Sequence, residues 1–539
     1  MHLNDSELEN RALWEKAGIR IPSFPRADMI AQTKQSPIWV HFGAGNIFRA
    51  FPAALQQTLL ERGLSRKGII VAEGYDGEII DRVYRPHDCL SLLVTLKPDG
   101  TIAKAVVGSI AEALRADDCQ SGGFARLREI FRCGSLQMAS FTITEKGYRL
   151  TGGDGRLLPD VKADFAAGPA EPRSYLGKIA ALCHERYAAG AKPLALVSLD
   201  NCSHNGEKLS AAIREFARQW GENGRASREF LDYLEDSSRV SFPWSMIDKI
   251  TPRPDESVQT MLEACGFEDT QGEITAKKTY VAPFVNAEET QYLVMEDSFP
   301  NGRPPLEKAG VIFTDRTTVE KTERMKVCTC LNPLHTALAL FGCLLGYTKI
   351  SDEMRDGDLV KLIRGIGFRE GLPVATDPGI LSPQAFLREV IEVRLPNAFL
   401  PDTPQRIATD TSQKIPIRFG ETMKAYLADK RLSIGSLRLI PLTLACWCRY
   451  LTGIDDAGRP FSPSPDPMLQ ELTAALSGLR PGCCGPVHPA LQPILSREDI
   501  FGVNLYKAGL GQTVEFDFKE LMAGPGAVRA TLRRRLANE

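Results

Sequence analysis

The segment from Pro37 to Arg62 restricts the possible folds of this chain more than any other. A short apolar run, Pro37–Phe42, stops at Gly43-Ala44-Gly45, and Ala50 to Arg62 follow with helical periodicity. This order is typical of a strand, a glycine turn and a helix. In dinucleotide-binding folds the first glycine of such a turn permits the tight bend, and the second lets the backbone approach the pyrophosphate at the helix N-terminus.

The turn departs from the full glycine fingerprint at one position. Phe48 stands where the third glycine is expected, so an ordinary turn between strand and helix is the alternative interpretation. We predict cofactor contacts from the five positions Gly43, Gly45, Asn46, Ile47 and Phe48.

A second buried run, Gly68–Ala72, ends at Glu73. An acidic side chain at this position commonly hydrogen-bonds the adenine ribose, and its charge disfavours a 2′-phosphate, so Glu73 favours NAD over NADP. The alternatives are a solvated glutamate at a strand end and Asp76 in the ribose role.

Apolar runs alternate with amphipathic stretches up to about Phe313, and beyond it apolar residues recur at helical spacing. We therefore predict an α/β domain with a mostly parallel sheet over residues 1–312 and a mainly α-helical domain over 313–539. Strands are expected at Leu90–Leu96, Ala139–Ile143, Leu194–Leu199 and Tyr280–Val285. Helices are expected at Gly123–Phe131, Ser174–Ala188, Thr336–Leu345, Leu359–Ile366, Pro383–Val393, Gly420–Leu432 and Ser436–Leu451.

The composition excludes several functional classes. A net charge of −2 gives no general attraction to nucleic acid or to an anionic membrane, so partners are expected to be small molecules or protein. The polar N-terminus lacks the pattern of a secretory signal, and we expect a cytoplasmic protein. The cysteine spacings at 328/330, 446/448 and 483/484 lack the two-residue gap of common zinc sites, which predicts reduced thiols and no metal.

The stretch Lys326–His335 places an amine, the Asn332 carboxamide and an imidazole inside an apolar run. A buried lysine near other cations loses its proton more easily and serves as a base, while an amide N–H holds a developing oxyanion. A capped helix end explains the same residue types without chemistry.

Two further segments carry polar side chains at the ends of apolar runs. Asn201 follows a strongly apolar strand, where parallel sheets bind ligands, and is a candidate donor to a substrate oxygen; an Asx turn is the alternative. Asp248 lies near the end of the apolar segment Phe242–Pro252, and we expect it to orient a catalytic or cofactor group; a pair with Lys249 or a turn cap is the alternative.

Eight segments, in order along the chain, carry a resemblance to a known family. They are Gly43-Ala44-Gly45 with Arg49, Ser140–Tyr148, Asp200-Asn201 with Asn205-Gly206, Ile247–Pro252, Glu296–Pro304, Lys326 with Asn332 and His335, Arg406–Lys414, and Ala445–Leu451. Over nearly its whole length the chain resembles the polyol-specific long-chain dehydrogenase/reductase family, the mannitol dehydrogenases and their hexuronate relatives. This resemblance implies a Rossmann-type N-terminal domain, a helical C-terminal domain, NAD(H) and no zinc.

The resemblance also implies roles for single residues. Lys326 corresponds to the general acid/base, and Asn201 and Asn332 to the oxyanion site. By the same correspondence, the substrate is contacted by His335, Arg406 and Lys414, and Asp248 lies near the nicotinamide. Burial together with the cations Arg406 and Lys414 favours a neutral Lys326 amine.

One spacing departs from the family pattern. Mannitol dehydrogenases have four residues between the lysine and the asparagine, whereas this chain has five between Lys326 and Asn332. At about 100° per residue, one extra position rotates Lys326 away from Asn332 on a regular helix. We expect either a π-bulge to absorb the residue, or Asn332 to cap a helix that starts at Pro333.

The segment Thr329–Ala337 is similar to that of mannonate-specific members of the family, and we therefore expect interconversion of D-mannonate and D-fructuronate. The alternatives are a mannitol or other polyol 2-dehydrogenase, a tagaturonate reductase, and a nucleotide-binding regulatory protein without turnover. The sequence does not decide the oligomeric state, and a monomer and a dimer are both compatible with it.

Overall fold

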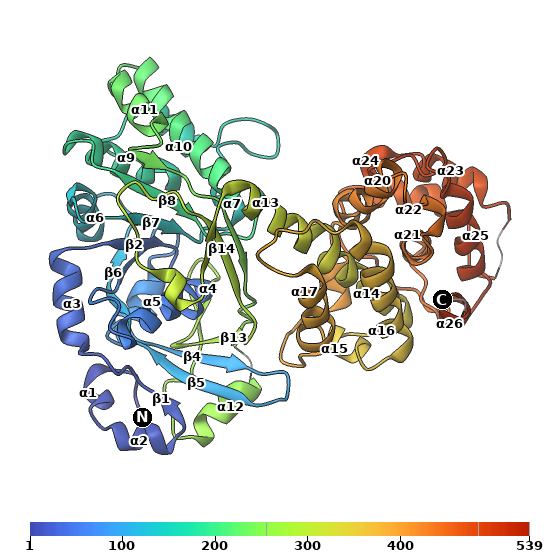
Figure 1. The fold of residues 1–539 in the computed structure, drawn as a ribbon, viewed down its shortest axis with the longest axis horizontal. Coiled ribbons are helices and arrows are strands. Elements are labelled where there is room, and N and C mark those ends of the chain that lie inside the picture. Colours follow the sequence, from blue (N-terminus) through green and yellow to red (C-terminus); the bar gives the residue numbers. More distant parts are fainter. Residues whose placement is uncertain (255, 483–484, 538–539) are drawn as a thin grey trace. The chain divides into compact units, whose positions relative to one another are not determined.

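A six-stranded parallel sheet organises the N-terminal half of the chain (Figure 1). In the computed structural model, which describes residues 1–254, 256–482 and 485–537, its order is β6-β3-β2-β7-β8-β9. The strands are β2 (Trp39–Phe42), β3 (Ile69–Glu73), β6 (Ile110–Arg115), β7 (Met138–Phe141), β8 (Leu194–Ser198) and β9 (Val240–Ser241), all paired in parallel. Numbered along the chain this is 3-2-1-4-5-6, the dinucleotide-binding order, and it reverses between β2 and β7.

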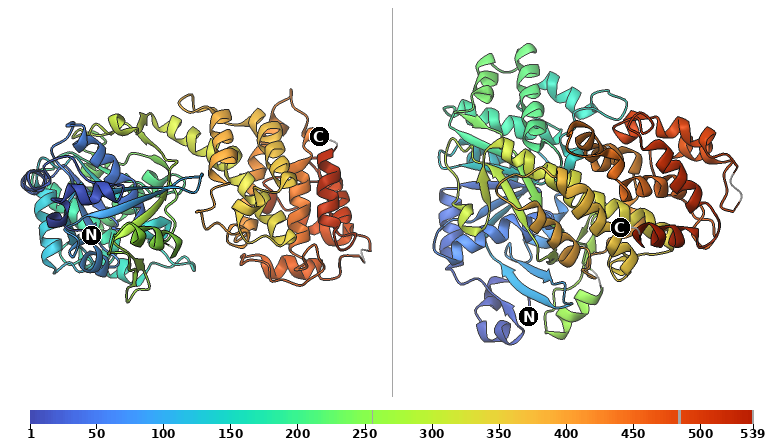
Figure 2. Two further views of the ribbon diagram at one scale, coloured as in Figure 1. Left: turned by 90° about the horizontal axis from the view of Figure 1, so that it is seen from below. Right: turned by 45° about the vertical axis from the view of Figure 1, so that its right-hand side comes forward.

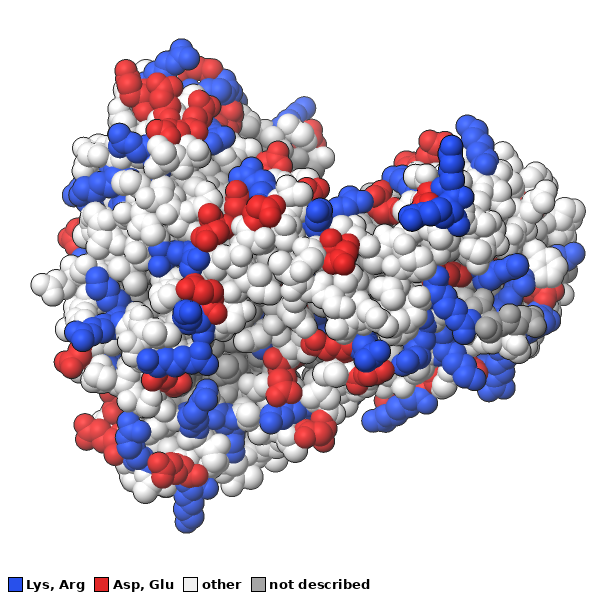
Figure 3. Space-filling view, viewed as in Figure 1, with Lys and Arg blue, Asp and Glu red and all other residues white. Residues whose placement is uncertain are grey.

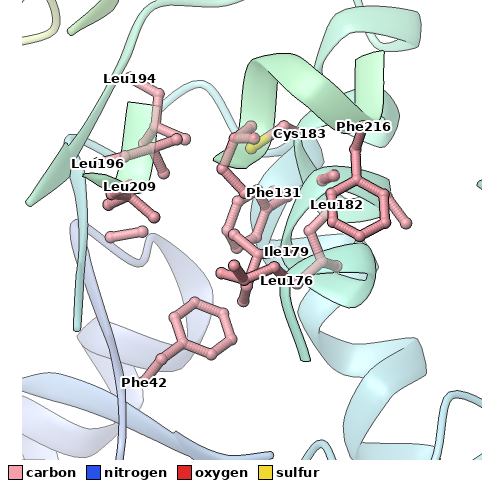
Figure 4. Packing of buried hydrophobic residues seen from close by; sticks show 14 of the residues in the cluster. Phe42, Phe131, Leu176, Ile179, Leu182, Cys183, Leu194, Leu196, Leu209 and Phe216 are labelled. Carbon is pink, nitrogen blue, oxygen red and sulfur yellow. The ribbon is translucent and has the colours of Figure 1, made fainter. Parts of the chain in front are cut away.

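Helices cover both faces of this sheet because successive side chains of each strand point to opposite sides. On one face, Val40 and Phe42 pack against α6 (Gly122–Arg132), α9 (Tyr175–Ala188) and α10 (Asn205–Glu222). Figure 4 shows Phe42 and Leu196 on the sheet side of this core and Phe131 and Ile179 on the helix side. On the other face, Trp39 packs with α4 (Asn46–Ala50) and α5 (Pro52–Glu61).

Smaller sheets complete this half. The predicted strand at Leu90–Leu96 forms as β4 (Ser91–Leu96), but it belongs to a separate mixed sheet. That sheet has the order β1 (Ile19–Arg20), β5 (Ile102–Val107), β4 and β13 (Phe284–Glu288), and another joins β10 (Ser245–Asp248), β14 (Tyr292–Glu296) and β15 (Ile312–Thr314). The expected strand at Tyr280–Val285 is divided between β12 (Tyr280–Val281) and β13.

The chain divides into two compact units. Unit 1 comprises Met1–Lys97 and Thr101–Glu320, and unit 2 comprises Pro98–Gly100 and Lys321–Glu539. On the face drawn in Figure 3, acidic and basic side chains are interspersed over unit 1, in keeping with the net charge of −2.

Unit 2 is helical, and within its described residues no strand occurs after β15 (Figure 2). The buried helix α21 (Leu439–Tyr450) packs against both α14 (Asn332–Leu345) and α25 (Gly511–Leu521). The other predicted helices correspond to α16 (Gly357–Arg364), α17 (Pro383–Glu389) and α20 (Glu421–Ala428), so the helical character expected of this half is confirmed.

Among the described residues, one helical stretch, Arg316–Leu345, is long and apolar enough to cross a membrane by length and composition. It has 30 residues and a mean hydropathy of 1.5, and 83% of its apolar window is buried inside the protein, as in a core helix.

Eleven of the cysteines lie in the described part of the chain, and all are free thiols. Cys483 and Cys484 lie outside the described residues. No cluster of three His, Cys, Asp or Glu side chains in the described ranges is arranged to hold a metal ion.

Candidate functional site

The glycine turn lies directly after β2, at the carboxyl end of the strand where the order of the sheet reverses. Gly43 has a φ of +110°, and a Cβ added there would lie 2.2 Å from the carbonyl oxygen of Thr142. Gly45 has a φ of −78° and precedes α4, and a Cβ added there would meet no atom within 4 Å. Gly43 is therefore required by the fold, whereas Gly45 leaves open space in front of the backbone.

A pocket of about 340 Å³ opens at this turn and is lined by Gly45, Asn46, Ile47, Thr251 and Tyr280, among others. Four of the predicted cofactor positions therefore line the pocket or shape its turn. The absent Cβ of Gly45 and the polar side chains of Asn46 and Thr251 fit the pyrophosphate of a dinucleotide.

Arg49 also lines this pocket and fixes the side chain of Asn46. Its Nη2 donates to Asn46 Oδ1 at 2.8 Å, and its Nη1 donates to the carbonyl oxygen of Ala282 at 2.7 Å. Burial lowers the pKa of this guanidinium. The sequence indicated Arg49 only as part of the family resemblance, because its partner Ala282 lies more than two hundred residues away in the chain.

Phe48 supports the glycine turn by packing in the hydrophobic core beside it. Its ring is fully buried and stacks on His41, with 4.3 Å between ring centroids. The two ring nitrogens of His41 lie 2.7 Å from Ser140 Oγ and 2.8 Å from Thr142 Oγ1, and burial lowers the pKa of His41 to about 3. Phe48 and a neutral His41 thus support the turn from β2 and β7.

Glu73 is buried at the end of β3, and its carboxylate accepts three backbone hydrogen bonds. The donors are the N–H groups of Ala44 at 2.8 Å, Tyr75 at 2.7 Å and Asp76 at 3.1 Å. Burial raises the pKa of Glu73 despite these donors. Glu73 therefore ties β3 to the glycine turn, and a carboxylate has about four acceptor positions, which leaves one for a ligand.

Asp76, the rival for the ribose role, is also buried. Its Oδ2 accepts a hydrogen bond from the hydroxyl of Thr275 at 2.6 Å.

Asp200 connects the ends of β7 and β8. It accepts hydrogen bonds from the N–H groups of Ile143 at 2.9 Å and Thr144 at 2.8 Å and from the hydroxyl of Tyr148 at 2.5 Å. Burial raises the pKa of Asp200 although these bonds oppose it. The loop that presents Asn201 is thus anchored by its neighbour, while Asn201 itself is exposed at the surface of unit 1.

Asn205 and Asp248 are buried in the same region of unit 1. The Asn205 side chain donates to the carbonyl oxygen of Ser245 at 2.9 Å and so fixes the start of α10 against β10. Asp248 is the last residue of β10.

Lys326 lies in a π-helical segment, η3 (Met325–Cys330), between α13 (Arg316–Arg324) and α14. The carbonyl oxygen of Lys326 accepts from the N–H of Leu331, five residues on, at 3.0 Å. The predicted π-bulge is present, and it absorbs the extra residue between Lys326 and Asn332. The alternative was wrong, because α14 begins at Asn332 itself and its N-cap, Leu331, makes no side-chain cap.

The side chain of Lys326 is 3% exposed, and those of Asn332 and His335 are half-buried. Asn332 and His335 share the first turn of α14. Nε2 of His335 is buried without a hydrogen bond from the described residues and lies 3.4 Å from Asp402 Oδ2.

Asp402 is a site residue that the sequence did not indicate, and it links two predicted ones. It faces His335 and forms an ion pair with Arg406, four residues on. Burial alone would raise the pKa of Asp402, but His335 and Arg406 outweigh it and lower the pKa. The structure thus brings together His335 and Arg406 through an acid whose only sequence signal is its spacing from Arg406.

Lys414 and Arg418 form the cationic part of this cluster. The ammonium of Lys414 donates to the carbonyl oxygens of Ile407, at 3.2 Å, and Thr409. Burial and the neighbouring charge of Arg418 lower the pKa of Lys414 to about 8. Arg418, which the sequence did not indicate, donates to Thr336 Oγ1 at 2.6 Å.

Strand order, the glycine turn at the point of reversal and the pocket beside it define a Rossmann-type nucleotide-binding protein with an additional helical unit. Residues 37–308 match the mannitol dehydrogenase Rossmann domain, and residues 318–518 match the mannitol dehydrogenase C-terminal domain. The chain belongs to the mannitol dehydrogenase family.

The chain is also similar to individual proteins of this family. The chain is 53% identical over 541 residues to a D-mannonate oxidoreductase of Thermotoga maritima, with all of both chains covered. It is 32% identical to a mannitol 2-dehydrogenase of Pyrenophora tritici-repentis, over 87% of this chain and 77% of that one. Among solved structures, it is similar to Pseudomonas fluorescens mannitol 2-dehydrogenase in a ternary complex with NAD and D-mannitol, with a TM-score of 0.72, 26% identity and full coverage of both chains.

Proposed function

We propose that this protein is an NAD-dependent oxidoreductase that interconverts D-mannonate and D-fructuronate. The observation that carries the proposal is the 53% identity to a D-mannonate oxidoreductase over the full length of both chains. In this proposal residues 1–312 bind the cofactor and residues 313–539 supply the substrate-binding and acid/base groups. The protein acts in the cytoplasm, without metal, as a monomer or dimer.

Lys326 is the general base in the oxidative direction. It removes the proton of the substrate hydroxyl, and Asn201 and Asn332 donate hydrogen bonds to the oxygen as negative charge develops on it. When bound, the nicotinamide cofactor supplies the hydride acceptor. In the reductive direction Lys326 returns the proton to the same oxygen. The burial of Lys326 and the location of Asn332 at the start of α14 support these roles.

His335, Arg406 and Lys414 bind the substrate in this proposal. Nε2 of His335 is suited to a sugar hydroxyl, because it is buried and its one close partner among the described residues, Asp402 Oδ2 at 3.4 Å, is too far away for a strong hydrogen bond. Asp248 lies near the nicotinamide.

The preference for NAD over NADP rests on Glu73. Its carboxylate, fixed by three backbone N–H groups, leaves one acceptor position for a ribose hydroxyl and repels a 2′-phosphate. Initial rates with NADH and NADPH test this, and equal kcat/KM for the two cofactors would contradict it.

The second candidate function is a mannitol or other polyol 2-dehydrogenase. It is favoured by the 32% identical fungal relative and by the similarity to the complex that contains D-mannitol. Tagaturonate reduction and nucleotide binding without turnover are the remaining alternatives.

A substrate panel with NADH distinguishes these functions. Fructuronate, tagaturonate and fructose are compared at equal enzyme concentration, and we expect the highest kcat/KM for fructuronate. A clear preference for fructose would replace the proposal by the polyol alternative. Lys326→Ala is expected to abolish turnover while NADH still binds; unchanged turnover would exclude Lys326 as the base.

A further inference from the structure

Arg418 lies in η7 (Pro416–Gly420), a π-helical turn that packs against η3, the segment of Lys326. Its Nη1 donates to Thr336 Oγ1 at 2.6 Å, and this hydroxyl donates to the carbonyl oxygen of Asn332 at 3.0 Å. The guanidinium is therefore fixed at the first turn of α14, where the proposed substrate ligands Asn332 and His335 begin the helix.

The charge of Arg418 is only poorly compensated by the protein. The side chain is half-buried, and burial lowers its pKa to about 10 with no acidic group acting against this. Among the residues that the structure describes, no carboxylate forms an ion pair with Arg418. The hydrogen bond to Thr336 uses one of the five N–H donors of a guanidinium.

The other two cations of this cluster are already engaged. Arg406 pairs with Asp402, and its side chain is 62% exposed. Lys414 donates to two main-chain carbonyl oxygens. Among the described residues, Arg418 is thus the one of these three cations that neither pairs with a carboxylate nor donates to a main-chain carbonyl oxygen.

A desolvated cation without a partner destabilises the protein, and a carboxylate from outside offsets that cost. The planar fork of a guanidinium matches a carboxylate in two parallel hydrogen bonds, whereas a polyol hydroxyl does not neutralise its charge. We propose that Arg418 anchors the carboxylate of the sugar-acid substrate and so determines the preference for sugar acids over polyols. This inference rests on the proposed function.

Arg418→Met in the full-length protein tests the role. Reduction of fructuronate by NADH is expected to show a KM raised roughly 10- to 100-fold, the loss of charge-assisted hydrogen bonds to one carboxylate. Its kcat should change less than the KM, because the carboxylate is bound in both the ground and the transition state. With fructose, which lacks the carboxylate, kcat/KM is expected to stay the same or to increase.

Thermal unfolding separates this role from a structural one. Because the variant removes an uncompensated charge, its unfolding midpoint is expected to equal or exceed that of the starting protein, whereas loss of a structural arginine would lower it. Arg418→Lys keeps the charge without the fork and should give an intermediate KM. Arg431→Met, at a side chain that is 88% exposed, is the matched control with unchanged kinetics.

The inference is overturned if Arg418→Met leaves the KM for fructuronate unchanged, or lowers kcat/KM for fructuronate and fructose equally. The substrate preference of the unsubstituted protein tests the proposed function separately. If it prefers tagaturonate, the same comparison is made with tagaturonate and tagatose, and a selective loss still supports Arg418. If it reduces only neutral ketoses, both the proposed function and the role of Arg418 fail.

Discussion

Gly43 and Gly45 stand two residues apart in one turn, yet they are glycines for different reasons. Gly43 combines a φ of +110° with a close approach to the carbonyl oxygen of Thr142, so any side chain there is strained. Gly45 has an ordinary φ of −78° and open space beside its Cα. The fold therefore explains Gly43 but not Gly45, and in our proposal a ligand approaches the backbone at Gly45.

Alanine substitutions distinguish the two roles. Gly43→Ala is expected to lower the thermal unfolding midpoint because the new Cβ would lie 2.2 Å from a backbone oxygen. Gly45→Ala is expected to leave the midpoint unchanged or slightly raised, since its φ suits alanine, and to weaken NADH binding about tenfold or more. Calorimetry and fluorescence titration with NADH measure both effects. Wild-type NADH affinity of Gly45→Ala would show that the pyrophosphate does not lie at this turn.

Single residues also show where sequence reasoning reaches its limit. Asn332 and His335 were predictable because they lie within ten residues of Lys326 in the chain. Asp402 and Arg418 were not, because they join this cluster only through tertiary packing, by contacts to His335 and Thr336 that span 67 and 82 positions. The sequence around Asp402 and Arg418 does not differ from that around an ordinary surface acid or surface arginine. Only the packing of the helices shows that the two residues belong to this cluster.

At the scale of elements, the π-helix η3 explains how this chain tolerates an extra residue next to its proposed base. A π-turn pairs residues five apart instead of four, as the Leu331 N–H and the Lys326 carbonyl oxygen do, so it takes up one residue more than a turn of α-helix. In our proposal this keeps Lys326 in register with Asn332.

Changing the length of η3 tests this register. Deletion of Val327, which is half-buried, is expected to convert the π-turn into a regular α-helix and to retain measurable turnover. Insertion of one alanine after Val327 is expected to abolish turnover while NADH still binds, because about 100° of further rotation has no second bulge to absorb it. Steady-state rates and NADH titration of both variants provide the measurement. An equal loss of turnover in the two variants would contradict the proposed register between Lys326 and Asn332.

Helix α15 (Ile350–Glu353) ends in a carboxyl group packed against α14. Glu353 is fully buried, neither carboxyl oxygen has a hydrogen bond within the described residues, and a Cβ on Gly342 would lie 1.8 Å from its Oε1. Burial raises the pKa of Glu353 from 4.5 to about 9. The carboxyl group is therefore protonated in the folded protein at neutral pH.

The linkage between protonation and folding gives this helix pair a pH-dependent stability. Because the folded state holds the proton up to about pH 9 and the unfolded state releases it near pH 4.5, stability falls as pH rises between these values. Glu353→Gln removes this dependence and is expected to stabilise the protein by up to about 3 kcal/mol at pH 7 and by little at pH 4.5. Urea unfolding at both pH values measures the difference, with exposed Glu498→Gln as control. An effect independent of pH would mean that Glu353 is ionised in the fold.

At the scale of the whole molecule, the alternation of strands and helices predicted the class of fold but not the pairing of the strands. β2, β3, β7 and β8 are buried, largely apolar runs and were predictable from the local sequence alone. β6 was missed because it forms one edge of the sheet and carries Glu112 and Arg115 in partly exposed positions. β4 was predicted as a strand, but its pairing with β13, nearly two hundred residues away, is decided by packing that no local pattern encodes.

The division of labour that we propose for the two units predicts how substitutions combine. Gly45 belongs to unit 1 and Arg418 to unit 2, and in our proposal they act on different ligands, the dinucleotide and the sugar acid. Substitutions at independent sites add within about 0.5 kcal/mol, so the double variant Gly45→Ala with Arg418→Met should lower kcat/KM by the product of the single effects, within about threefold.

A pair within unit 2 provides the matched comparison. Arg418 and Thr336 are hydrogen-bonded at 2.6 Å, so Arg418→Met and Thr336→Val should combine with a coupling of roughly 0.5 kcal/mol or more, since either change alone already breaks their contact. Both cycles are measured as kcat/KM for fructuronate at subsaturating NADH. Strong coupling between Gly45 and Arg418, as large as that between Arg418 and Thr336, would show that cofactor and carboxylate binding are not separate functions of the two units.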